Sequence, residues 1–352
     1  MAIAGLAGGL EALGHSVRTV GGGSPRRMAM PDRLRFNLSL ARSGAAVVGS
    51  DLVVGFDMDG FALRARDRGP RYVVCLKGIM ADELRFESGW PRMRFRLLSR
   101  LERRNARTAD VVMVTSEYSR KQAIGAYGLA QRRVRVVPEG IDPAWWELPP
   151  PGGDAEGSGP GVAGGADAGA RPRAGGPIIL SVARQYRRKN TIALLRAMPA
   201  IRATVGDARL RIVGGGPELG HLVRERRALG LEGTVDILGE LPGLEALRAE
   251  YRRADLFCLP SLQEGFGIAF LEAMASGLAV VACRSAAVPE IVRHGETGLL
   301  VPPADPVALA EAVGLLLGNR QRRAEMGMAG RRRARAYGWE AVASRFLAAA
   351  GF

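Results

Sequence analysis

Residues 255–283 read DLFCLPSLQEGFGIAFLEAMASGLAVVAC, and the expected architecture follows from this one stretch. It begins and ends with short apolar runs, DLFCLP and LAVVAC, which are typical of strands buried on both faces of a sheet. Between them a GFG turn leads into IAFLEAMA, an apolar segment of helical length. A strand, a crossover helix and a second strand form the repeating unit of a parallel sheet. The stretch therefore predicts an α/β fold.

The same alternation extends toward the N-terminus. Three more strand candidates come before this stretch: IILSVA (178–183), RLRIVG (209–214) and TVDIL (234–238). Helical patterns follow them at about 191–204, 218–229 and 244–253. Alternating strands and helices predict a parallel sheet with helices on both faces, and such sheets bind ligands at the carboxyl ends of their strands.

The first half of the chain shows this alternation more weakly. Its strand candidates are SVRTV (16–20), DLVVG (51–55), YVVCL (72–76), VVMVT (111–115) and VRVVP (134–138). We therefore expect two Rossmann-like domains that face each other across a cleft. A doubly wound domain opens with a strand and a glycine-rich turn, whereas this chain begins in a helical pattern, AGLAGGLEALG. We therefore expect either that the true start lies upstream or that the N-terminal domain lacks its first strand.

Composition divides the chain into four parts. Residues 149–176 consist mainly of Gly, Ala, Pro and Ser and offer nothing to bury, so we interpret them as a flexible linker. Residues 1–148 and 177–337 are the two expected domains. Residues 338–352 are expected to form a C-terminal helix, and its packing against the N-terminal domain is a hypothesis.

The charge and the cysteine content of the chain narrow the kinds of ligand and the cellular setting that we expect. The 352 residues carry a net charge of +15, which attracts phosphates, anionic lipids or nucleic acid. No apolar run reaches the ~18 residues of a membrane-spanning helix, and Glu11 interrupts an opening that has no basic start, which makes it a poor signal peptide. The three cysteines and three histidines have no disulfide or metal-ligand spacing. Free thiols in a reducing, cytoplasmic setting are the default interpretation.

Two glutamates, Glu264 and Glu272, stand eight positions apart in the opening stretch. Glu272 lies within FLEAM, where a helix normally places core side chains, and a buried carboxylate is costly unless hydrogen bonds satisfy it. A ribose diol could supply two hydroxyl donors. The alternative is that Glu264 caps the helix and that Glu272 pairs with an arginine.

The glycine-rich turn before this helix is a candidate phosphate site. Backbone amides at a helix N-terminus form a natural seat for an anion, and glycine lets the backbone come close to a ligand. The amides in question are those of Gly265, Phe266, Gly267 and Ile268.

A second candidate cluster follows the strand IILSVA. Arg184 and Lys189 lie in the loop RQYRRKN, at the strand end where the cleft is expected, and two cations there suit a diphosphate. A solvated basic loop is the alternative. IVGGGPE (212–218), which contains Gly215, resembles a dinucleotide fingerprint only weakly, because its spacing is not G-x-G-x-x-G. A tight turn in which Pro217 opens a helix explains it equally well.

A basic stripe lies in the first half, within residues 86–110. If this segment is helical from about Pro91, five arginines share one face at 100° per residue. They are Arg92, Arg96, Arg100, Arg103 and Arg107. One hypothesis is docking to an anionic membrane surface, and the alternative is a solvated helix face. Nucleic acid is not expected as a partner, because aromatic residues do not interleave with the stripe.

Several motifs together resemble the family-four glycosyltransferases. In order, they are IILSVARQYRRKN, IVGGGPEL, ADLFCLPSLQEGFGIAFLEAMASGLAVVA, VPEIV and ETGLLVPP. The resemblance covers residues 178–340, and its hallmark is a pair of glutamates with seven residues between them, as in Glu264 and Glu272. The first half is similar more loosely, through LGHSV, ADVVMVTSEYSR and VRVVPEGID. Such enzymes are retaining and have the two-Rossmann GT-B architecture.

The resemblance implies roles for individual residues. Glu272 would hold the ribose of the nucleotide, and Glu264 would approach the hydroxyls of the donor sugar. Arg184 and Lys189 would neutralise the diphosphate. The remaining donor-binding residues would act largely through their backbone: Gly265, Phe266, Gly267 and Ile268 at the sugar and phosphates, Leu238, Gly239 and Leu241 at the base, and Gly215 in the glycine turn.

The chain departs from the family pattern in its first half. Relatives often carry a histidine near the transferred sugar, whereas this chain has Lys77 and Gly78 after the strand YVVCL. We treat these two as candidate site residues, and a plain surface lysine is the alternative.

The resemblance implies transfer of a sugar, with retained configuration, from a nucleotide-diphosphate-sugar donor to an unidentified acceptor, either lipid-linked or a glycan. Residues 1–148 would bind the acceptor and residues 177–337 the donor. No cofactor and no metal are expected. The alternatives are a nucleotide-sugar epimerase of the same architecture and a non-catalytic nucleotide-sugar-binding protein. The expected location is cytoplasmic, with the inner face of the membrane as a further hypothesis.

Overall fold

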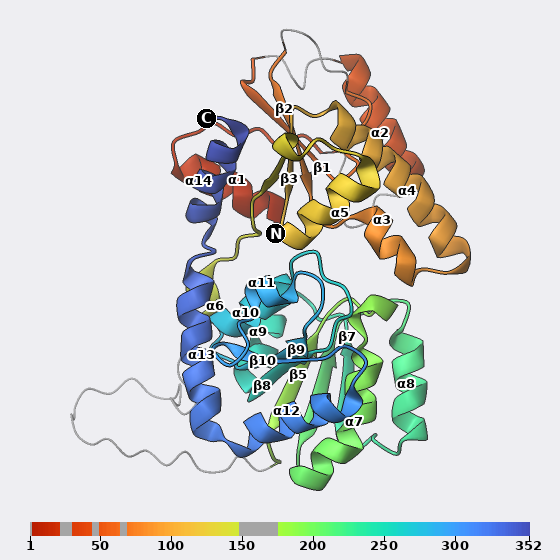
Figure 1. Cartoon of the computed structure of the whole chain (residues 1–352), viewed down its shortest axis with the longest axis vertical. Coiled ribbons are helices and arrows are strands. Elements are labelled where there is room, and N and C mark those ends of the chain that lie inside the picture. Colours follow the sequence, from red (N-terminus) through yellow and green to blue (C-terminus); the bar gives the residue numbers. More distant parts are fainter. Residues whose placement is uncertain (1, 22–29, 44–48, 64–68, 148–174) are drawn as a thin grey trace, which may run out of the picture.

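The computed structural model describes residues 2–21, 30–43, 49–63, 69–147 and 175–352. Within these ranges it contains two parallel sheets, one in each half of the chain (Figure 1). The first sheet has strand order β1-β2-β3-β4, and the second has order β10-β9-β8-β5-β6-β7. The expected fold class of two Rossmann-like domains is therefore confirmed. Almost all of the linker predicted over 149–176 lies outside the described residues.

The N-terminal domain contains these elements: α1 (Ala2–Ala12), α2 (Met30–Ser43), β1 (Leu52–Phe56), β2 (Arg71–Leu76), α3 (Met80–Glu83), η1 (Leu84–Phe86), α4 (Gly89–Thr108), β3 (Val111–Val114), α5 (Glu117–Tyr127), η2 (Gln131–Arg133), β4 (Val134–Val136) and α6 (Pro143–Trp146). Four of the five strand candidates of this half are strands. The fifth, SVRTV (16–20), is wrong, because its backbone is irregular. Its residue types favour a strand, but β structure forms only where a neighbouring backbone completes the ladder.

The C-terminal domain and the helix beyond it contain these elements: β5 (Ile178–Val182), η3 (Arg187–Lys189), α7 (Thr191–Thr204), β6 (Arg209–Val213), α8 (Leu219–Ala228), β7 (Val235–Gly239), α9 (Leu244–Arg253), β8 (Leu256–Leu259), α10 (Ile268–Ala275), β9 (Val280–Cys283), α11 (Val288–Ile291), β10 (Gly298–Val301), α12 (Pro306–Gly318), α13 (Arg320–Arg335) and α14 (Trp339–Ala350).

Each sheet is buried on both faces, as the apolar strands require. In β8, Phe257 and Leu259 enter the core layer shared with α9 and α10, whereas Cys258 enters the layer shared with α7 and α12. In β2, Val74 packs with α5, whereas Val73 packs with α1 and α14. This alternation follows from the period of two along a strand.

The chain crosses between the domains twice, and the two crossings touch. The amide of Ile141, after β4, donates to the carbonyl of Tyr337 at 2.9 Å, just before α14. From there α14 packs against α1, beside the N-terminal sheet (Figure 1). Trp339 is the first residue of α14, and Gly5 and Gly140 leave room for its ring. The first and last helices of the chain therefore both pack on the N-terminal domain.

Candidate active site

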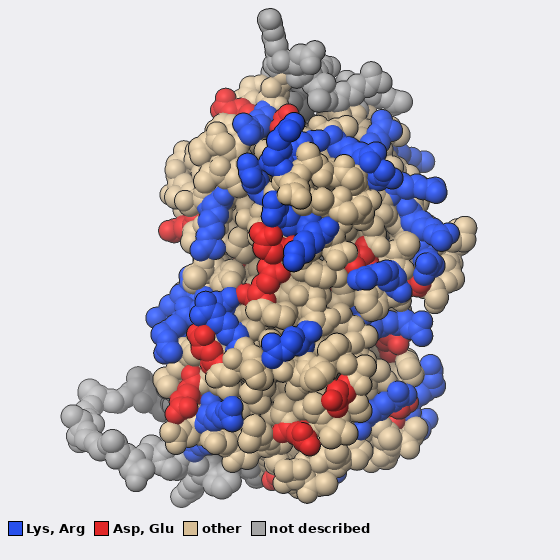
Figure 2. Space-filling model, in the orientation of Figure 1, with Lys and Arg blue, Asp and Glu red and all other residues tan. Residues whose placement is uncertain are grey.

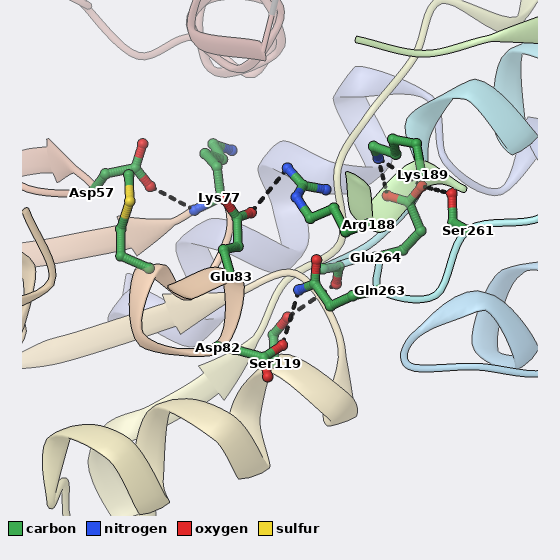
Figure 3. Close-up of polar contacts among 12 residues, drawn as sticks. Asp57, Lys77, Asp82, Glu83, Ser119, Arg188, Lys189, Ser261, Gln263 and Glu264 are labelled. Carbon is green, nitrogen blue, oxygen red and sulfur yellow. Dashed lines mark hydrogen bonds and ion pairs between the residues drawn. The ribbon is translucent and has the colours of Figure 1, made fainter. Parts of the chain in front are cut away.

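The predicted donor residues gather at the carboxyl ends of β5, β6, β7 and β8, on the side of the C-terminal domain that faces the N-terminal domain. Loops leave the sheet there because parallel strands all end at the same edge. The loop after β5 carries the cations, and the loop after β8 carries Glu264 and the GFG turn. Figure 3 shows the side chains that meet from the two domains.

Glu264 and Lys189 form a buried ion pair (Figure 3). The Nζ of Lys189 lies 2.6 Å from Oε1 and 2.7 Å from Oε2 of Glu264. The hydroxyl of Ser261 donates a third hydrogen bond to Oε1 at 2.8 Å. Burial lowers the pKa of Lys189, while the Glu264 carboxylate attracts its charge and opposes this effect. A cation and a carboxylate are thus held together at the domain boundary.

Glu272 lies inside the C-terminal domain, on α10. It is 5% exposed, and the hydroxyl of Tyr251, on α9, donates to its Oε2 at 3.0 Å. Burial raises the pKa of Glu272 to about 7, and the hydrogen bond from Tyr251 offsets part of this rise. Among the described contacts the partner of Glu272 is a tyrosine, and none of the ion pairs found there joins Glu272 to an arginine.

The GFG turn holds a run of amides at the start of α10. Gly267 has φ +97, in the left-handed region that side chains disfavour, and a Cβ there would lie 2.5 Å from the ring of Phe270. Among the described residues, we find no acceptor for the amides of Gly265, Phe266, Gly267 or Ile268. Four such amides at a helix N-terminus can donate hydrogen bonds to phosphate oxygens. The ring of Phe266 packs on Tyr337, so only its backbone is available to a ligand.

The turns after β6 and β7 lie side by side. The amide of Gly214 donates to the carbonyl of Gly239 at 2.7 Å, and a Cβ at Gly215 would lie 2.9 Å from Cγ of Glu240. Gln185, which is buried and follows β5, is bonded to the turn after β6, because its backbone amide donates to the Gly215 carbonyl at 2.9 Å. Leu238 and Leu241, the predicted base-edge residues, flank this turn and are partly buried.

Arg184 is placed differently from Lys189. Arg184 is exposed, and its guanidinium lies 5.6 Å from the ring centroid of Tyr186. The guanidinium of Arg188 lies 5.4 Å from the same centroid. Arg188, in the same loop, forms an ion pair with Glu83 of the N-terminal domain at 3.2 Å (Figure 3), so this part of the loop is not simply solvated. The described contacts join Lys189 to Glu264 and leave Arg184 apart from both.

Lys77 and Gly78 lie directly against the GFG turn. A Cβ at Gly265 would lie 3.3 Å from the carbonyl oxygen of Lys77 and 3.5 Å from Cα of Gly78. The Nζ of Lys77 pairs with Glu139 at 2.7 Å, and its amide donates to Asp57 at 2.8 Å. Burial disfavours the charge of Lys77, but neighbouring negative groups, Glu139 foremost, outweigh this and raise its pKa. Lys77 is therefore a paired cation at the domain boundary.

Three residues of the site were not predicted from the sequence: Ser261, Tyr251 and Gln185. Ser261 precedes Glu264 by three residues, and this local spacing is a usable signal. Tyr251 sits in an amphipathic helix, where an aromatic residue indicates core packing, so its bond to Glu272 could not be predicted from sequence. Within the described part of the chain, no group of three or more His, Cys, Asp or Glu side chains could hold a metal ion.

Two family models match this chain. One, described as Glycosyltransferase Family 4, matches residues 2–145, and the other, described as Glycosyl transferases group 1, matches residues 168–333. The chain belongs to the family-four glycosyltransferases. The resemblance based on the glutamate pair is thereby confirmed.

Curated relatives of this chain include two kinds of enzyme whose names mention inositol. A "GDP-mannose-dependent alpha-(1-6)-phosphatidylinositol monomannoside mannosyltransferase" of Mycolicibacterium smegmatis is 36% identical over 65% of this chain and 58% of that protein. A "D-inositol 3-phosphate glycosyltransferase" of Corynebacterium glutamicum is 33% identical over 67% of this chain and 56% of that protein. The chain thus spans less than two thirds of either relative.

Solved structures show the same architecture. Sucrose-phosphate synthase from Thermosynechococcus elongatus superposes with a TM-score of 0.74 at 23% identity, over 98% of this chain and 90% of that one. HepE of Anabaena, solved in complex with UDP and glucose, superposes with a TM-score of 0.69 at 19% identity, over 89% of this chain and 80% of that one. These matches support the fold of two Rossmann-like domains.

The predicted basic stripe lies on α4. Arg96, Arg100, Arg103 and Arg107 are exposed, and Arg92 is half-buried. Arg92 donates to the carbonyl of Glu87, and Arg107 donates to that of Tyr127. Basic side chains cover the side of the molecule where Figure 1 places α4 (Figure 2).

Three apolar side chains of α4 are also exposed: Trp90 (76%), Met93 (61%) and Leu97 (47%). No helix in the described ranges is both long and apolar enough to cross a membrane.

Proposed function

We propose that this protein transfers a sugar from a nucleoside-diphosphate sugar to an acceptor hydroxyl, with retention of configuration and without a metal ion. The observation that carries this proposal is the pairing of Lys189 with Glu264 beside the amides of the GFG turn. A leaving diphosphate gains negative charge, and preorganised donors aimed at that charge usually contribute most to catalysis. Lys189 and the four amides would perform this task.

Each site residue would then have a separate role. Glu272 would accept hydrogen bonds from the ribose, and Glu264 would bind hydroxyls of the sugar once Lys189 turns toward the phosphates. Arg184 is exposed and free of ion pairs among the described residues, so it can move onto the diphosphate. The bond from C1 to the phosphate oxygen breaks with its electron pair on the phosphate. The acceptor oxygen bonds to C1 on the same face, and its proton passes to the departing phosphate.

For the donor and acceptor, we propose GDP-mannose and an inositol-containing lipid or phosphate. Relatives at 33–36% identity carry names that specify GDP-mannose, phosphatidylinositol mannoside or inositol 3-phosphate.

The test is a donor panel of GDP-mannose, UDP-glucose and ADP-glucose with phosphatidylinositol mannoside and inositol 3-phosphate as acceptors, each with and without EDTA. We expect transfer that EDTA does not affect and an α-linked product by NMR. Glu264→Gln and Lys189→Met should lower kcat/KM by about a hundredfold or more, in the range of a lost charge-stabilising group. Glu296→Gln, in an exposed pair with Arg293, is the matched control.

Other outcomes identify the alternatives. Conversion of one nucleotide sugar into its epimer without an acceptor would indicate an epimerase. Binding of GDP without turnover of any donor would indicate a non-catalytic protein. An inverted product would overturn the proposed stereochemistry.

We also propose that α4 docks the protein to an anionic membrane on the cytoplasmic side. Its exposed face combines arginines with Trp90, Met93 and Leu97, and a basic face with apolar anchors suits the lipid interface. Cys75, Cys258 and Cys283 are free and buried, which fits a reducing compartment.

Vesicle sedimentation tests the docking. Vesicles rich in phosphatidylglycerol should bind the protein at low salt and release it at high salt, and vesicles of phosphatidylcholine alone should not bind it. Arg96→Glu/Arg100→Glu should abolish binding, whereas Arg332→Glu, at an exposed position on α13, should not. Equal sedimentation of both variants would refute a role for α4.

A further inference from the structure

Two sequence motifs that the donor site does not use meet across the domain boundary. TSEYSR (115–120), within ADVVMVTSEYSR, directly follows β3 and includes the start of α5 in the N-terminal domain. VPEIV contains α11 of the C-terminal domain. Glu117 of the first motif and Glu290 of the second are in contact although they are 173 positions apart. The two motifs join the domains beside the GFG turn.

The carbonyl oxygen of Gly265 accepts hydrogen bonds from three hydroxyl groups of the N-terminal domain. Ser116 Oγ lies 2.6 Å from it, and Thr115 Oγ1 and Ser119 Oγ each lie 3.0 Å from it. All three side chains belong to residues that are at most 4% exposed. A carbonyl oxygen has two lone pairs, so three buried donors saturate it. The orientation of this one carbonyl is therefore set by the opposite domain.

Fixing this carbonyl also fixes an amide of the proposed phosphate site. In a trans peptide the C=O of Gly265 and the N–H of Phe266 lie in one plane and point in opposite directions. Glycines at 265 and 267 make this turn conformationally permissive, so its own backbone does not hold the peptide in place. The hydroxyls supply that restraint from outside the turn.

Glu290, on α11, holds the N-terminus of α5 in position. Its carboxylate accepts hydrogen bonds from the amides of Glu117 at 2.8 Å and Tyr118 at 2.9 Å. A carboxylate is favourable there because it satisfies unpaired amides and complements the helix dipole. The third amide, of Ser119, donates to Ser116 Oγ at 3.0 Å. The contact is thus polar throughout.

Two further polar contacts join the domains in addition to the contact between Glu290 and α5. Gln263 donates to Asp82 at 2.9 Å, and Arg188 pairs with Glu83, both across the same boundary (Figure 3). Polar contacts of this kind can exchange for water when a domain boundary opens.

We propose that Ser116 and Ser119 are positioning residues that orient the donor turn through the Gly265 carbonyl, and that Glu290 docks α5 for this purpose. The inference rests on the proposed function of the turn. Its consequence is that the phosphate amides reach their working geometry only when the two domains are docked, which couples domain closure to catalysis.

The kinetic test uses two alanine variants, the double variant Ser116→Ala/Ser119→Ala and the single variant Glu290→Ala. They are compared with the conservative Ser116→Thr and with the control Glu296→Gln. The first two variants should lower kcat by about tenfold or more, as expected when reacting groups are misplaced. The affinity for GDP, measured by calorimetry, should change less than about threefold, since Glu272 lies wholly within the C-terminal domain. Ser116→Thr keeps the hydroxyl, so its kcat should be close to that of wild type.

A kcat within about twofold of wild type in both alanine variants would overturn the proposal, as would parallel losses of kcat, GDP affinity and melting temperature.

A second measurement does not depend on activity. Hydrogen–deuterium exchange across residues 260–270 should be about tenfold faster in both alanine variants than in wild type or Glu296→Gln, because the turn loses its external restraint. Unchanged exchange would overturn the positioning role even if the enzyme is active. Wild-type protein that turns over no donor would instead refute the proposed function, and the exchange result would still decide whether the contact orders the turn.

Discussion

At the scale of single residues, the site keeps a carboxylate where the fold alone would prefer an apolar side chain. Glu272 is buried, and within the described ranges its two oxygens have one hydroxyl partner, Tyr251. Its raised pKa reflects the cost of burying the charge. A ligand hydroxyl would supply the missing donors, so the residue makes physical sense as a binding group.

This gives a pH-dependent prediction for Glu272→Gln. The folded-state pKa of about 7 lies above the ordinary 4.5, so the folded protein holds an extra proton between these values and wild-type stability falls as pH rises through this window. Above pH 7 the penalty is complete, at about 3 kcal/mol. We expect the variant to be more stable than wild type at pH 8 and similar at pH 4.5, by urea denaturation at both values. It should also bind GDP more weakly. A stability difference that does not depend on pH would contradict the burial argument.

The buried pair of Lys189 and Glu264 gives a second residue-scale prediction. Lys189→Met leaves a buried carboxylate with Ser261 as its one remaining side-chain partner among the described residues, and breaking a buried pair in this way costs about 3–5 kcal/mol. The double variant Lys189→Met/Glu264→Gln should recover much of this loss in urea denaturation. Arg196→Met removes an exposed pair with Glu225 and should leave the midpoint nearly unchanged. A double variant no more stable than Lys189→Met would argue against the pairing.

At the scale of elements, the turn before α10 depends on one glycine. Gly267 combines a positive φ with close contact to Phe270, whereas Gly295 has a similar φ of +81 and open space, with no atom within 4 Å of the place that a Cβ would take. Gly295→Ala should therefore cost only the backbone strain, about 1–2 kcal/mol, and leave transfer intact. Gly267→Ala should cost more in thermal denaturation and lower donor kcat/KM by about tenfold or more, because the turn must shift. Equal activity in the two variants would contradict a role for the turn.

At the scale of the whole molecule, the last helix ties the C-terminal part of the chain to its first helix. α14 packs on α1, where a Cβ at Gly9 would lie 2.6 Å from the carbonyl oxygen of Trp339, while Gly8 is open. Gly9→Ala should therefore destabilise the protein by about 1–3 kcal/mol through overpacking. Gly8→Ala should stabilise it by up to about 1 kcal/mol through helix propensity. Differential scanning calorimetry of the pair checks this, and equal melting temperatures would refute close packing at Gly9.

The alternation of strands and helices, the parallel sheets and the motif pair of Glu264 and Glu272 could be predicted from local periodicity and spacing. The strand predicted at residues 16–20 is wrong, since residue preference alone does not supply a neighbouring backbone. The partners of the site residues became known from the three-dimensional structure: Lys189 for Glu264, Tyr251 for Glu272, and Ser116 for the carbonyl of Gly265, 149 residues away. Crossover connections bring such distant segments to one sheet edge, and no local pattern records which side chains meet there.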